Sequence, residues 1–436
     1  MTRIRSFVIV LLAICSELLP FNLTYALAVQ GELTTVNGIR VLRLSGTPYE
    51  MGYAHGALLA EDIVMLLEEY MLGTLVDVDN YSRTRLLLQR YTHMPPAYWV
   101  ELQGMYDGMR DVLGSEGLYS KKLHGLFQPV DLFAWNMVPE IFRLYFSSRG
   151  DVQACSSISG WGAGTSDGRL VFARNLEFGS PGDVLEQTPL IIAYKPCGLF
   201  RHAWVSITWP GYIGCLTGMN EAGIGAALNL GNAQPELDEL LLNIDGVYIG
   251  IPLWYGSITF TLRQALEQWS PLWSWRDPLT HIFHLVRRNP VAGSFDIHVF
   301  APATFTAMTG GLAAAVIECN NRGTALRTAA DNRAAEPTLD TNYFLVVTNH
   351  HRKLVEPVPC RRYERLVELL NETDTLDMAT ALAYEQEVAQ RREPFNTVHR
   401  VGMMPDVREL WIGFARDGMP AADVPPVHIT WEDLFR

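Results

Sequence analysis

The residues Ala154-Cys155-Ser156-Ser157 mark the point at which the sequence changes character. Before them, apolar residues recur at helical spacing. After them come short strand-like runs separated by turn signals. Cleavage of the peptide bond between Ala154 and Cys155 would place a free α-amine beside the thiol. That amine has an ordinary pKa of about 8, against about 8.5 for the thiol, so it can accept the thiol proton without a histidine. Cys155 is therefore the candidate nucleophile.

The segment before Cys155 has a helical pattern. Thr47-Pro48-Tyr49-Glu50 combines a capping residue, a proline at the first helical position and a glutamate three residues after the cap. Apolar residues at helical spacing follow from Met51 to Leu67. A second helix is expected over 82–92, before Pro95-Pro96 stops it. A third helix follows these prolines and ends at Leu113, and a fourth runs from Leu132 to Phe146.

The segment after Cys155 is rich in strands. A hairpin is expected from 156–162 and 169–178, with its turn at Gly164-Thr165-Ser166-Asp167-Gly168. Further strands are expected at 190–194, 202–209, 213–217, 223–228, 296–300, 313–318 and 343–348, and helices at 258–269, 277–288, 361–370 and 376–390. Two batches of strands with helices between and after them predict layered sheets with outer helices, rather than an alternating parallel fold.

Five other residues are candidates for the site. Arg174 and Glu177 lie three apart on the second hairpin strand, so they should face opposite ways unless the strand bends or bulges. Asn220 lies in a turn and Asn349 ends a strand. Taken singly, each asparagine is typical of a turn, and Arg362 is typical of a solvated helix residue.

Taken together, the motifs resemble the N-terminal-nucleophile hydrolases. The nearest resemblance is to the acyl-coenzyme A:6-aminopenicillanic-acid acyltransferase-like branch, and a more distant one is to penicillin V acylases, bile-salt hydrolases, acid ceramidase and N-acylethanolamine acid amidase. The similar stretches are 46–56, Ala154-Cys155-Ser156-Ser157, Ala173-Arg174-Asn175-Leu176-Glu177-Phe178, Met219-Asn220-Glu221-Ala222-Gly223, Thr348-Asn349-His350 and Arg362-Tyr363-Glu364-Arg365-Leu366. The motifs occur in order along the sequence, and the resemblance covers most of the mature chain.

The resemblance implies a fold and a set of roles. The fold would be an α+β, four-layer α/β/β/α sandwich with an N-terminal helical propeptide part, matured by cleavage between Ala154 and Cys155. Arg174 and Glu177 would position and polarise the nucleophile, Asn220 and Asn349 would contribute to the oxyanion hole, and Arg362 would close the charge network. No cofactor or metal is implied. Two departures stand out: Glu177 replaces the commoner aspartate, and a second histidine, His351, follows His350 where an aromatic residue is frequent.

The N-terminus predicts export. Arg3 and Arg5 precede an apolar run from Phe7 to Ile14, and Ala26-Leu27-Ala28 offers a cleavage site. We therefore expect a signal peptide at 1–28, a helical fragment at 29–154 and a nucleophile fragment at 155–436, with the two fragments remaining associated. The protein would be periplasmic or secreted. The formal net charge of 34 − 47 = −13 argues against nucleic acid or an anionic membrane as partner, and no other segment predicts a membrane span.

The six cysteines take different parts in this interpretation. Cys15 leaves with the signal peptide and Cys155 must stay reduced. Cys197, Cys215, Cys319 and Cys360 are an even remainder that an oxidising compartment would allow to form up to two disulfides. The first pairing to consider is Cys197 with Cys215.

Other motifs give weaker signals. Gly164-x-Ser166-x-Gly168 has the spacing of a serine-hydrolase elbow, but a strand rather than a helix follows it. His281-x-x-His284 has no third metal ligand in the pattern. The tryptophans at 254, 269, 273 and 275 fit packing better than an acyl pocket.

Three functions remain open. The first is an amidase that cleaves the C–N bond of linear amides with a hydrophobic, lipid-like acyl group. The second is an acyltransferase or penicillin-type acylase that transfers the acyl group to an amine. The third is a secreted binding protein that keeps the fold without the chemistry.

Overall fold

The computed structural model describes residues 30–141, 155–179, 181–231, 241–244, 247–250, 255–268, 277–291, 293–392 and 395–436. Several sequence predictions lie outside these residues: the signal peptide at 1–28, Ala154 of the cleavage junction, the end of the helix expected at 132–146, and Trp254, Trp269, Trp273 and Trp275. No helix in the described ranges is long and apolar enough to cross a membrane.

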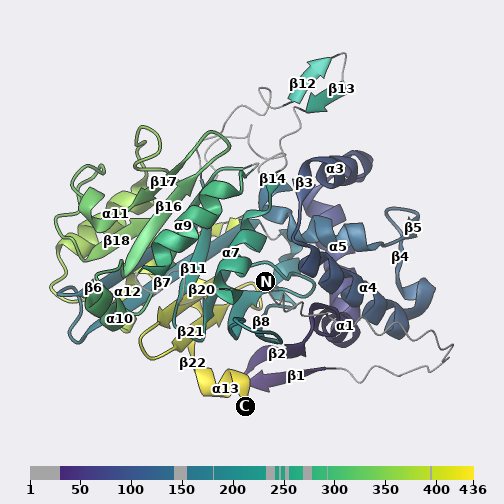
Figure 1. Cartoon of the computed structure of the whole chain (residues 1–436), viewed down its shortest axis with the longest axis horizontal. Coiled ribbons are helices and arrows are strands. Elements are labelled where there is room, and N and C mark those ends of the chain that lie inside the picture. Colours follow the sequence, from purple (N-terminus) through teal and green to yellow (C-terminus); the bar gives the residue numbers. More distant parts are fainter. Residues whose placement is uncertain are drawn as a thin grey trace, which may run out of the picture.

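Two large sheets form the centre of the molecule (Figure 1). The first is nine-stranded, and its spatial order is β1 (Gly31–Val36), β2 (Ile39–Gly46), β8 (Leu190–Pro196), β9 (Trp204–Thr208), β10 (Thr217–Asn220), β11 (Gly225–Leu230), β15 (Phe295–Phe300), β16 (Ala314–Cys319) and β17 (Thr324–Arg327). The pairs are antiparallel except for β2 with β8.

The second sheet is seven-stranded and carries Cys155. Its order is β18 (Phe344–Val347), β6 (Cys155–Gly162), β7 (Gly168–Gly179), β20 (Phe395–Met404), β21 (Glu409–Phe414) and β22 (Val427–Thr430), with β19 (Arg391–Arg392) pairing on β20. All of its pairs are antiparallel. β6 lies between β18 and β7; its first residue, Cys155, pairs with Leu176 of β7, whereas the β18 register ends at Ser157.

Helices cover the two outer faces. Those before Cys155 are α1 (Pro48–Leu58), α2 (Ala60–Met65), the π-helix η1 (Leu66–Leu75), α3 (Val78–Tyr91), α4 (Pro96–Gly117) and α5 (Pro129–Asn136); those after it are α7 (Ile258–Glu267), α9 (Pro278–Arg288), α11 (Arg361–Asn371) and α12 (Met378–Glu387). Two short helices, α10 (Ala303–Thr309) and α13 (Trp431–Phe435), pack instead against the core between the two sheets. There are also three two-stranded pairs: β3 (Thr92–His93) with β14 (Tyr255–Gly256), β4 (Tyr119–Ser120) with β5 (Gly125–Leu126), and β12 (Leu241–Ile244) with β13 (Val247–Gly250). The 3-10 helices η2 (Pro181–Glu186), η4 (Ala329–Asp331) and η5 (Ala421–Asp423) complete the described elements.

Three apolar cores define four layers. One core contains Phe172, Ile207 and Val401 and joins the inner faces of the two sheets. A second holds α1, α4, α5, α7 and α9 against the outer face of the nine-stranded sheet. A third holds α11 and α12 against the seven-stranded sheet (Figure 1). Alternating side chains along each buried strand feed both neighbouring cores. The predicted α+β, four-layer α/β/β/α sandwich is therefore confirmed.

Some predictions of individual elements are wrong. The segment before Cys155 is not wholly helical, because β1 and β2 form a hairpin that joins the nine-stranded sheet. Its turn is Asn37-Gly38, both with positive φ, which is a strong hairpin signal that the helical pattern nearby obscured. The strand expected at 213–217 begins only at Thr217, and the three C-terminal strands β20 to β22 were not predicted.

The expected Cys197–Cys215 disulfide is also wrong, since all five described cysteines are free. Cys197 lies exposed just beyond β8, where its N–H bonds to the Gly46 carbonyl at 2.8 Å. Cys215 is buried, and its N–H bonds to Thr259 of α7 at 3.1 Å. The two residues bracket the β8–β9 pair in sequence, but Cys197 is tied to the end of β2 and Cys215 to α7.

Candidate active site

The backbone of Cys155 is held on both sides by side chains from distant parts of the chain. Its N–H donates to Asn349 Oδ1 at 3.0 Å. Its carbonyl accepts from Arg362 Nη1 at 2.9 Å. Arg362 Nη2 also donates to Asn349 Oδ1 at 2.6 Å, and Asn349 Nδ2 donates to the Leu230 carbonyl at 2.7 Å. The nitrogen that cleavage would turn into an α-amine therefore already has an acceptor and a neighbouring cation.

The thiol of Cys155 is buried beside a second cation. Burial raises its pKa, and the Arg174 guanidinium and the Glu177 backbone N–H act in the opposite direction by favouring the thiolate. Arg174 is fixed by three hydrogen bonds, to the Leu216 carbonyl at 2.9 Å, to Thr217 Oγ1 at 2.6 Å and to the Leu228 carbonyl at 3.0 Å. A raised pKa keeps the thiol protonated at neutral pH, so a base close by is needed to activate it.

Glu177 reaches the nucleophile from the other face of the sheet. Its Oε2 accepts from Arg362 Nη1 at 2.7 Å, while Oε1 accepts from the Gln390 N–H at 3.1 Å and from Thr397 Oγ1 at 3.3 Å. Burial raises the pKa of this carboxyl, and Arg362 opposes the shift. Arg174 and Glu177 thus do face opposite ways, as the spacing predicts. No bend is needed for both to act, because Arg362 carries the contact from Glu177 to the Cys155 carbonyl.

Asn220 occupies a different position from the other candidates. Its Oδ1 accepts from the backbone N–H groups of Ala222 and Ile224 at 3.0 Å each, and its Nδ2 donates to the Leu266 carbonyl at 3.0 Å. These bonds close the β10–β11 turn and tie it to the end of α7. The structure brings Cys155, Arg174, Glu177, Asn349 and Arg362 into one hydrogen-bonded group, and it places Asn220 in this turn.

The structure identifies Asn229 as a site residue that the sequence reasoning missed. It lies on β11 between Leu228, whose carbonyl accepts from Arg174, and Leu230, whose carbonyl accepts from Asn349. Its Nδ2 donates to the Thr348 carbonyl at 3.3 Å, and its buried Oδ1 has no partner among the described residues. One signal was available: Asn229 is a polar residue inside the otherwise apolar, fully buried strand 225–230, a position that needs an explanation.

A second missed residue is Glu385 of α12, behind the nucleophile strand. Its Oε2 accepts from Ser156 Oγ, and its Oε1 is buried without a partner among the described residues. Burial raises its pKa to about 8, although the Ser156 hydrogen bond opposes the shift. This carboxyl is therefore mostly neutral at pH 7.

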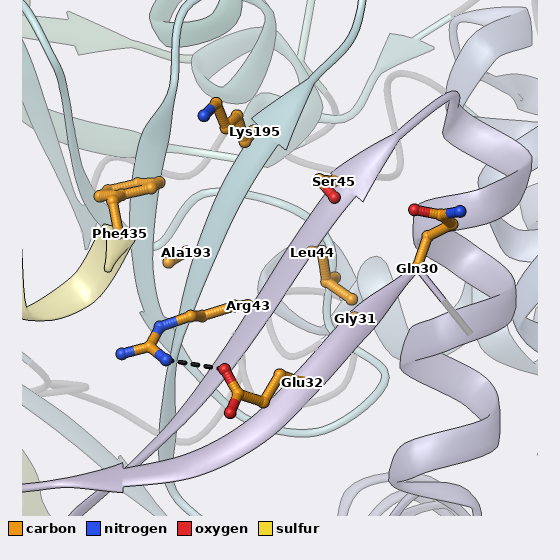
Figure 2. Close-up of a pocket in the computed structure, with 9 residues that line it drawn as sticks. All are labelled: Gln30, Gly31, Glu32, Arg43, Leu44, Ser45, Ala193, Lys195 and Phe435. Carbon is orange, nitrogen blue, oxygen red and sulfur yellow. Dashed lines mark hydrogen bonds and ion pairs between the residues drawn. The ribbon is translucent and has the colours of Figure 1, made fainter. Parts of the chain in front are cut away.

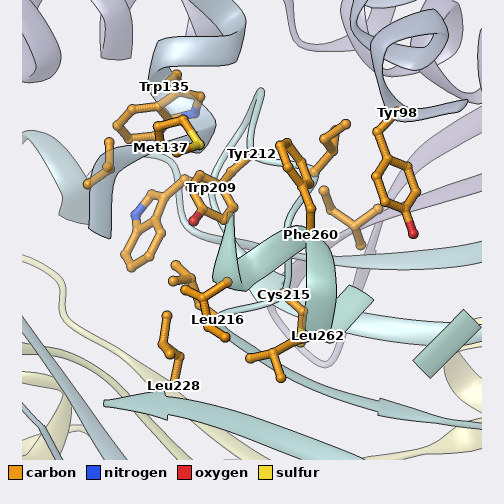
Figure 3. Close-up of a cluster of buried hydrophobic side chains, with 14 of the residues drawn as sticks. Tyr98, Trp135, Met137, Trp209, Tyr212, Cys215, Leu216, Leu228, Phe260 and Leu262 are labelled. Atoms are coloured by element: carbon orange, nitrogen blue, oxygen red, sulfur yellow. The ribbon is translucent and has the colours of Figure 1, made fainter. Parts of the chain in front are cut away.

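The segment before Cys155 supports the rear of the site. Asn136 Oδ1 accepts from the N–H groups of Ile213 and Gly214 at 2.7 and 3.2 Å, and Trp135 Nε1 donates to the Pro210 carbonyl at 2.9 Å. These bonds hold the loop that ends at Leu216, a partner of Arg174. Figure 3 shows the apolar side chains of this region, with Trp135 and Met137 beside Trp209 and Tyr212, and Leu216 close to Leu228.

A pocket lies elsewhere, at the β1–β2 edge of the nine-stranded sheet (Figure 2). Its lining includes Lys195, Phe435 and the ion pair of Arg43 with Glu32, whose Nη1 and Oε2 are 2.7 Å apart. None of the six predicted site residues lines it.

No family model matches the chain. An uncharacterized protein of Archaeoglobus fulgidus is 27% identical over 205 residues, which are 44% of this chain and 33% of that protein. The protein dcd1B of Dictyostelium discoideum is 25% identical over 198 residues, which are 42% of this chain and 37% of that protein. The protein dcd1A of the same organism is 27% identical over 216 residues, which are 42% of this chain and 43% of that protein. The chain therefore spans less than half the length of these curated relatives.

Solved structures with a similar arrangement include an acid amidase, a conjugated bile acid hydrolase and a penicillin V acylase. The N-acylethanolamine-hydrolyzing acid amidase ortholog of Caenorhabditis elegans is 18% identical, with 58% of this chain and 93% of that chain covered and a TM-score of 0.40. A mutant of the conjugated bile acid hydrolase of Clostridium perfringens is 12% identical (64% and 92% covered, TM-score 0.39), and the penicillin V acylase of Agrobacterium tumefaciens is 13% identical (64% and 88% covered, TM-score 0.39). At 12–18% identity and TM-scores of 0.39–0.40, this likeness concerns the fold alone.

Proposed function

We propose that the protein is an N-terminal-nucleophile hydrolase that cleaves the C–N bond of linear amides through Cys155. The observation that carries the proposal is the pairing of the Cys155 backbone nitrogen with Asn349 Oδ1, under the Arg362 guanidinium and with Arg174 on the thiol side. Cleavage after Ala154 would turn that nitrogen into the base of the reaction. Residues 29–154 and 155–436 would then be the two fragments of the active enzyme.

The reaction would proceed in two steps. The α-amine takes the thiol proton, and the sulfur attacks the amide carbonyl. The C–N bond then breaks, leaving an acyl thioester on Cys155, while the proton passes to the departing amine. Water attacks the thioester next, and the carboxylic acid and the free thiol are released. Arg362 supports the first step because a neighbouring positive charge disfavours the protonated form of the amine.

The developing oxyanion needs hydrogen-bond donors, and the β11 wall offers them. Asn229 Nδ2 carries two N–H groups, of which one is used on the Thr348 carbonyl. We assign the oxyanion donors to Asn229 and Asn349, and we give Asn220 the turn-forming role that its hydrogen bonds describe. Glu177 would hold Arg362 in place and would not touch the substrate.

The acyl group would be hydrophobic. Cys155 belongs to the same buried apolar cluster as Leu176, Phe178, Leu216 and Leu228, so the surroundings of the thiol favour apolar atoms over charged ones. An acyltransferase that uses an amine in place of water, or a secreted binding protein with the same fold, remains the alternative. The expectation of export stays a part of this proposal.

Intact-mass measurement and N-terminal sequencing of the wild-type protein and of Cys155→Ala test the proposal. The wild type should yield two chains, the second beginning at Cys155, and Cys155→Ala should remain one chain. The matured protein should then hydrolyse members of a panel of N-acyl amides with different chain lengths. An added acceptor amine separates hydrolysis from transfer, because transfer would give a new amide. An active uncut wild type, or a Cys155→Ala protein that still matures, would contradict the mechanism.

A further inference from the structure

A second buried hydrogen-bonded chain lies next to the site but outside the group just described. His351 Nδ1 bonds to Asp296 Oδ1 at 2.6 Å, and His351 Nε2 bonds to Ser294 Oγ at 3.0 Å. All three residues are about 1% exposed or less. His351 is the second histidine of the motif, at the position where the sequence departs from the pattern it resembles.

The chain is not suited to chemistry of its own. The backbone of Gly231 covers Ser294 Oγ so closely that a Cβ there would lie 2.5 Å from this oxygen, which leaves no room beside it for a substrate. Asp296, Glu318 and His351 are close enough together to hold a metal ion, but most of their ligand atoms are already committed, and among them only Asp296 Oδ2 has no partner within the described residues. Both nitrogens of His351 are used, and both oxygens of Glu318 are occupied: Oε1 accepts from Arg327 Nε and the Arg352 N–H, and Oε2 accepts from the N–H groups of Lys353 and Leu354.

The position of the chain points to a structural task at the site. Asp296 lies on β15 of the nine-stranded sheet, directly opposite Asn229 of β11 in the register. His351 lies just beyond β18 of the seven-stranded sheet, two residues after Asn349. The His351–Asp296 bond therefore ties together the two sheets that supply the two walls of the site, next to the residue that accepts from the Cys155 nitrogen.

The end of β11, whose Leu230 carbonyl accepts from Asn349, packs directly against the hydrogen-bonded chain of Ser294, His351 and Asp296. Asn349 Nδ2 donates to the Leu230 carbonyl, and the following residue, Gly231, donates its N–H to the Ser294 carbonyl at 2.7 Å. A Cβ at Gly231 would lie 2.5 Å from Ser294 Oγ and 2.9 Å from His351 Cε1, so only glycine lets the backbone come this close. A shift of His351 would therefore displace the end of β11, whose Leu230 carbonyl accepts from Asn349.

We infer that Asp296, His351 and Ser294 are positioning residues that set the orientation of Asn349 toward the Cys155 α-amine. This inference rests on the proposed function. Asp296 orients the imidazole through Nδ1, Ser294 fixes the other ring nitrogen, and the loop 348–352 is thereby held at the register that the amine requires. The charged groups that face the pair are Glu318 and Arg327, which neutralise each other through their own ion pair at 2.9 Å.

Another buried serine–histidine contact in the protein offers a matched control for the experiment. His298, on the same strand as Asp296, bonds through its two ring nitrogens to Ser157 Oγ at 3.0 Å and Ser159 Oγ at 2.9 Å. Ser159→Ala removes one buried serine–histidine bond between the same two sheets, as Ser294→Ala does, but away from Asn349. Any general loosening of the sandwich should affect the two variants alike.

Steady-state kinetics on the matured protein, with the best amide of the panel, give the first measurement. Ser294→Ala and Asp296→Asn should lower kcat about ten- to a hundredfold with KM nearly unchanged, because a small misplacement of a reacting group has this cost. Ser159→Ala should change kcat less than about twofold, although its unfolding temperature should fall by about as much as that of Ser294→Ala. Equal effects on kcat in Ser294→Ala and Ser159→Ala would overturn the inference. If Asp296→Asn does not fold, the comparison of kcat between Ser294→Ala and Ser159→Ala tests the inference by itself.

A second measurement does not depend on amide hydrolysis. The rate of Cys155 alkylation by iodoacetamide is followed against pH with peptide-level mass spectrometry. Peptide resolution is needed because Cys360 also has a perturbed thiol. Burial acts to raise the pKa of Cys360, but hydrogen bonds from His350 and the Tyr363 N–H outweigh it and lower the pKa to about 6. The midpoint for Cys155 should move to higher pH in Asp296→Asn and Ser294→Ala, and not in Ser159→Ala. If the wild type has no amidase activity but the two variants still show this shift relative to it, the proposed function fails and the positioning role stands. If the midpoints of the two variants equal that of the wild type, the positioning role is overturned.

Discussion

Asn220 and Asn229 lie on neighbouring strands, yet their side chains have different surroundings. Asn220 is satisfied inside its own turn, whereas Asn229 stands between the carbonyls that receive Arg174 and Asn349. The motif made Asn220 the candidate because an asparagine in a glycine-containing turn is easy to recognise. A polar residue in a buried strand is harder to interpret, since its meaning depends on what the opposite sheet presents to it.

Paired alanine substitutions separate the two roles. Asn229→Ala should lower kcat by about 10²–10³, the usual loss for one oxyanion donor. Asn220→Ala should lower the free energy of unfolding by about 1–2 kcal/mol through lost turn bonds and leave kcat within about twofold. Steady-state kinetics and urea denaturation of both variants check this. A larger kcat loss in Asn220→Ala than in Asn229→Ala would restore the assignment made from the motif.

Glu385 predicts a pH dependence of stability. Burial raises its pKa to about 8 in the folded protein, well above the ordinary value of 4.5. A carboxyl with a raised folded pKa contributes stability that is fully present below pH 4.5 and is lost as the pH rises through about 8. Glu385→Gln, which resembles the neutral form, should therefore gain stability relative to wild type as the pH rises from 5 to about 8.5.

Urea denaturation of wild type and Glu385→Gln at several pH values measures that difference. The exposed pair of Arg365 with Glu387 offers a control on neighbouring helices, and Glu387→Gln should show a much smaller pH trend because exposed ion pairs contribute little. A stability difference between wild type and Glu385→Gln that stays constant with pH would show that Glu385 titrates normally.

At the scale of elements, the start of α1 was predicted well. Thr47 and Glu50 form the expected capping box, with Glu50 N–H to Thr47 Oγ1 at 3.3 Å and Thr47 N–H to Glu50 Oε2 at 2.8 Å. These contacts lie within four residues, so local sequence determines them. What α1 packs against was not predictable in this way, because its partner α4 begins at Pro96.

The contact of α1 with α4 depends on glycines on both helices. A Cβ at Gly52 would lie 1.9 Å from the Glu101 carbonyl oxygen, and one at Gly104 would lie 2.3 Å from the Tyr49 carbonyl oxygen. Gly52→Ala and Gly104→Ala should force the helices apart and lower the free energy of unfolding by about 1–3 kcal/mol or more. Gly125→Ala, whose nearest atom would be 3.9 Å away, is the control and should have little effect. Thermal unfolding of the three variants checks the order, and equal losses would contradict the close packing.

At the scale of the whole molecule, the segment before Cys155 is part of the same body as the rest. Its hairpin β1–β2 extends the nine-stranded sheet through β8, and its Glu101 makes a bidentate, fully buried ion pair with Arg263 of α7, with contacts of 3.0 and 2.6 Å. Asn136 and Trp135 hold the loop behind the site. Separation of the two fragments would expose all of these surfaces to water.

We therefore expect the cleaved fragments to remain together. Matured protein should elute from a sizing column as one species that contains both chains, and the chains should separate only in denaturant. The uncut Cys155→Ala protein serves as the reference elution position. Separate elution of the two chains in native buffer would show that the contacts across the cleavage point do not hold the fragments.

The sequence by itself determined the helix caps, the change of pattern at Cys155, most of the strands around it, and five of the side chains that the structure gathers at the site. These features depend on periodicity and on motifs a few residues long. The tertiary structure alone decided that Asn229 bonds to the Thr348 carbonyl while Asn220 is used in its own turn, and that Glu177 contacts the Cys155 carbonyl through Arg362. It also decided that Cys197 and Cys215 form no disulfide and that His351 bonds to Asp296. Each of these depends on contacts between residues far apart in the chain. Such contacts are fixed by how the two sheets stack, and no local pattern records that stacking.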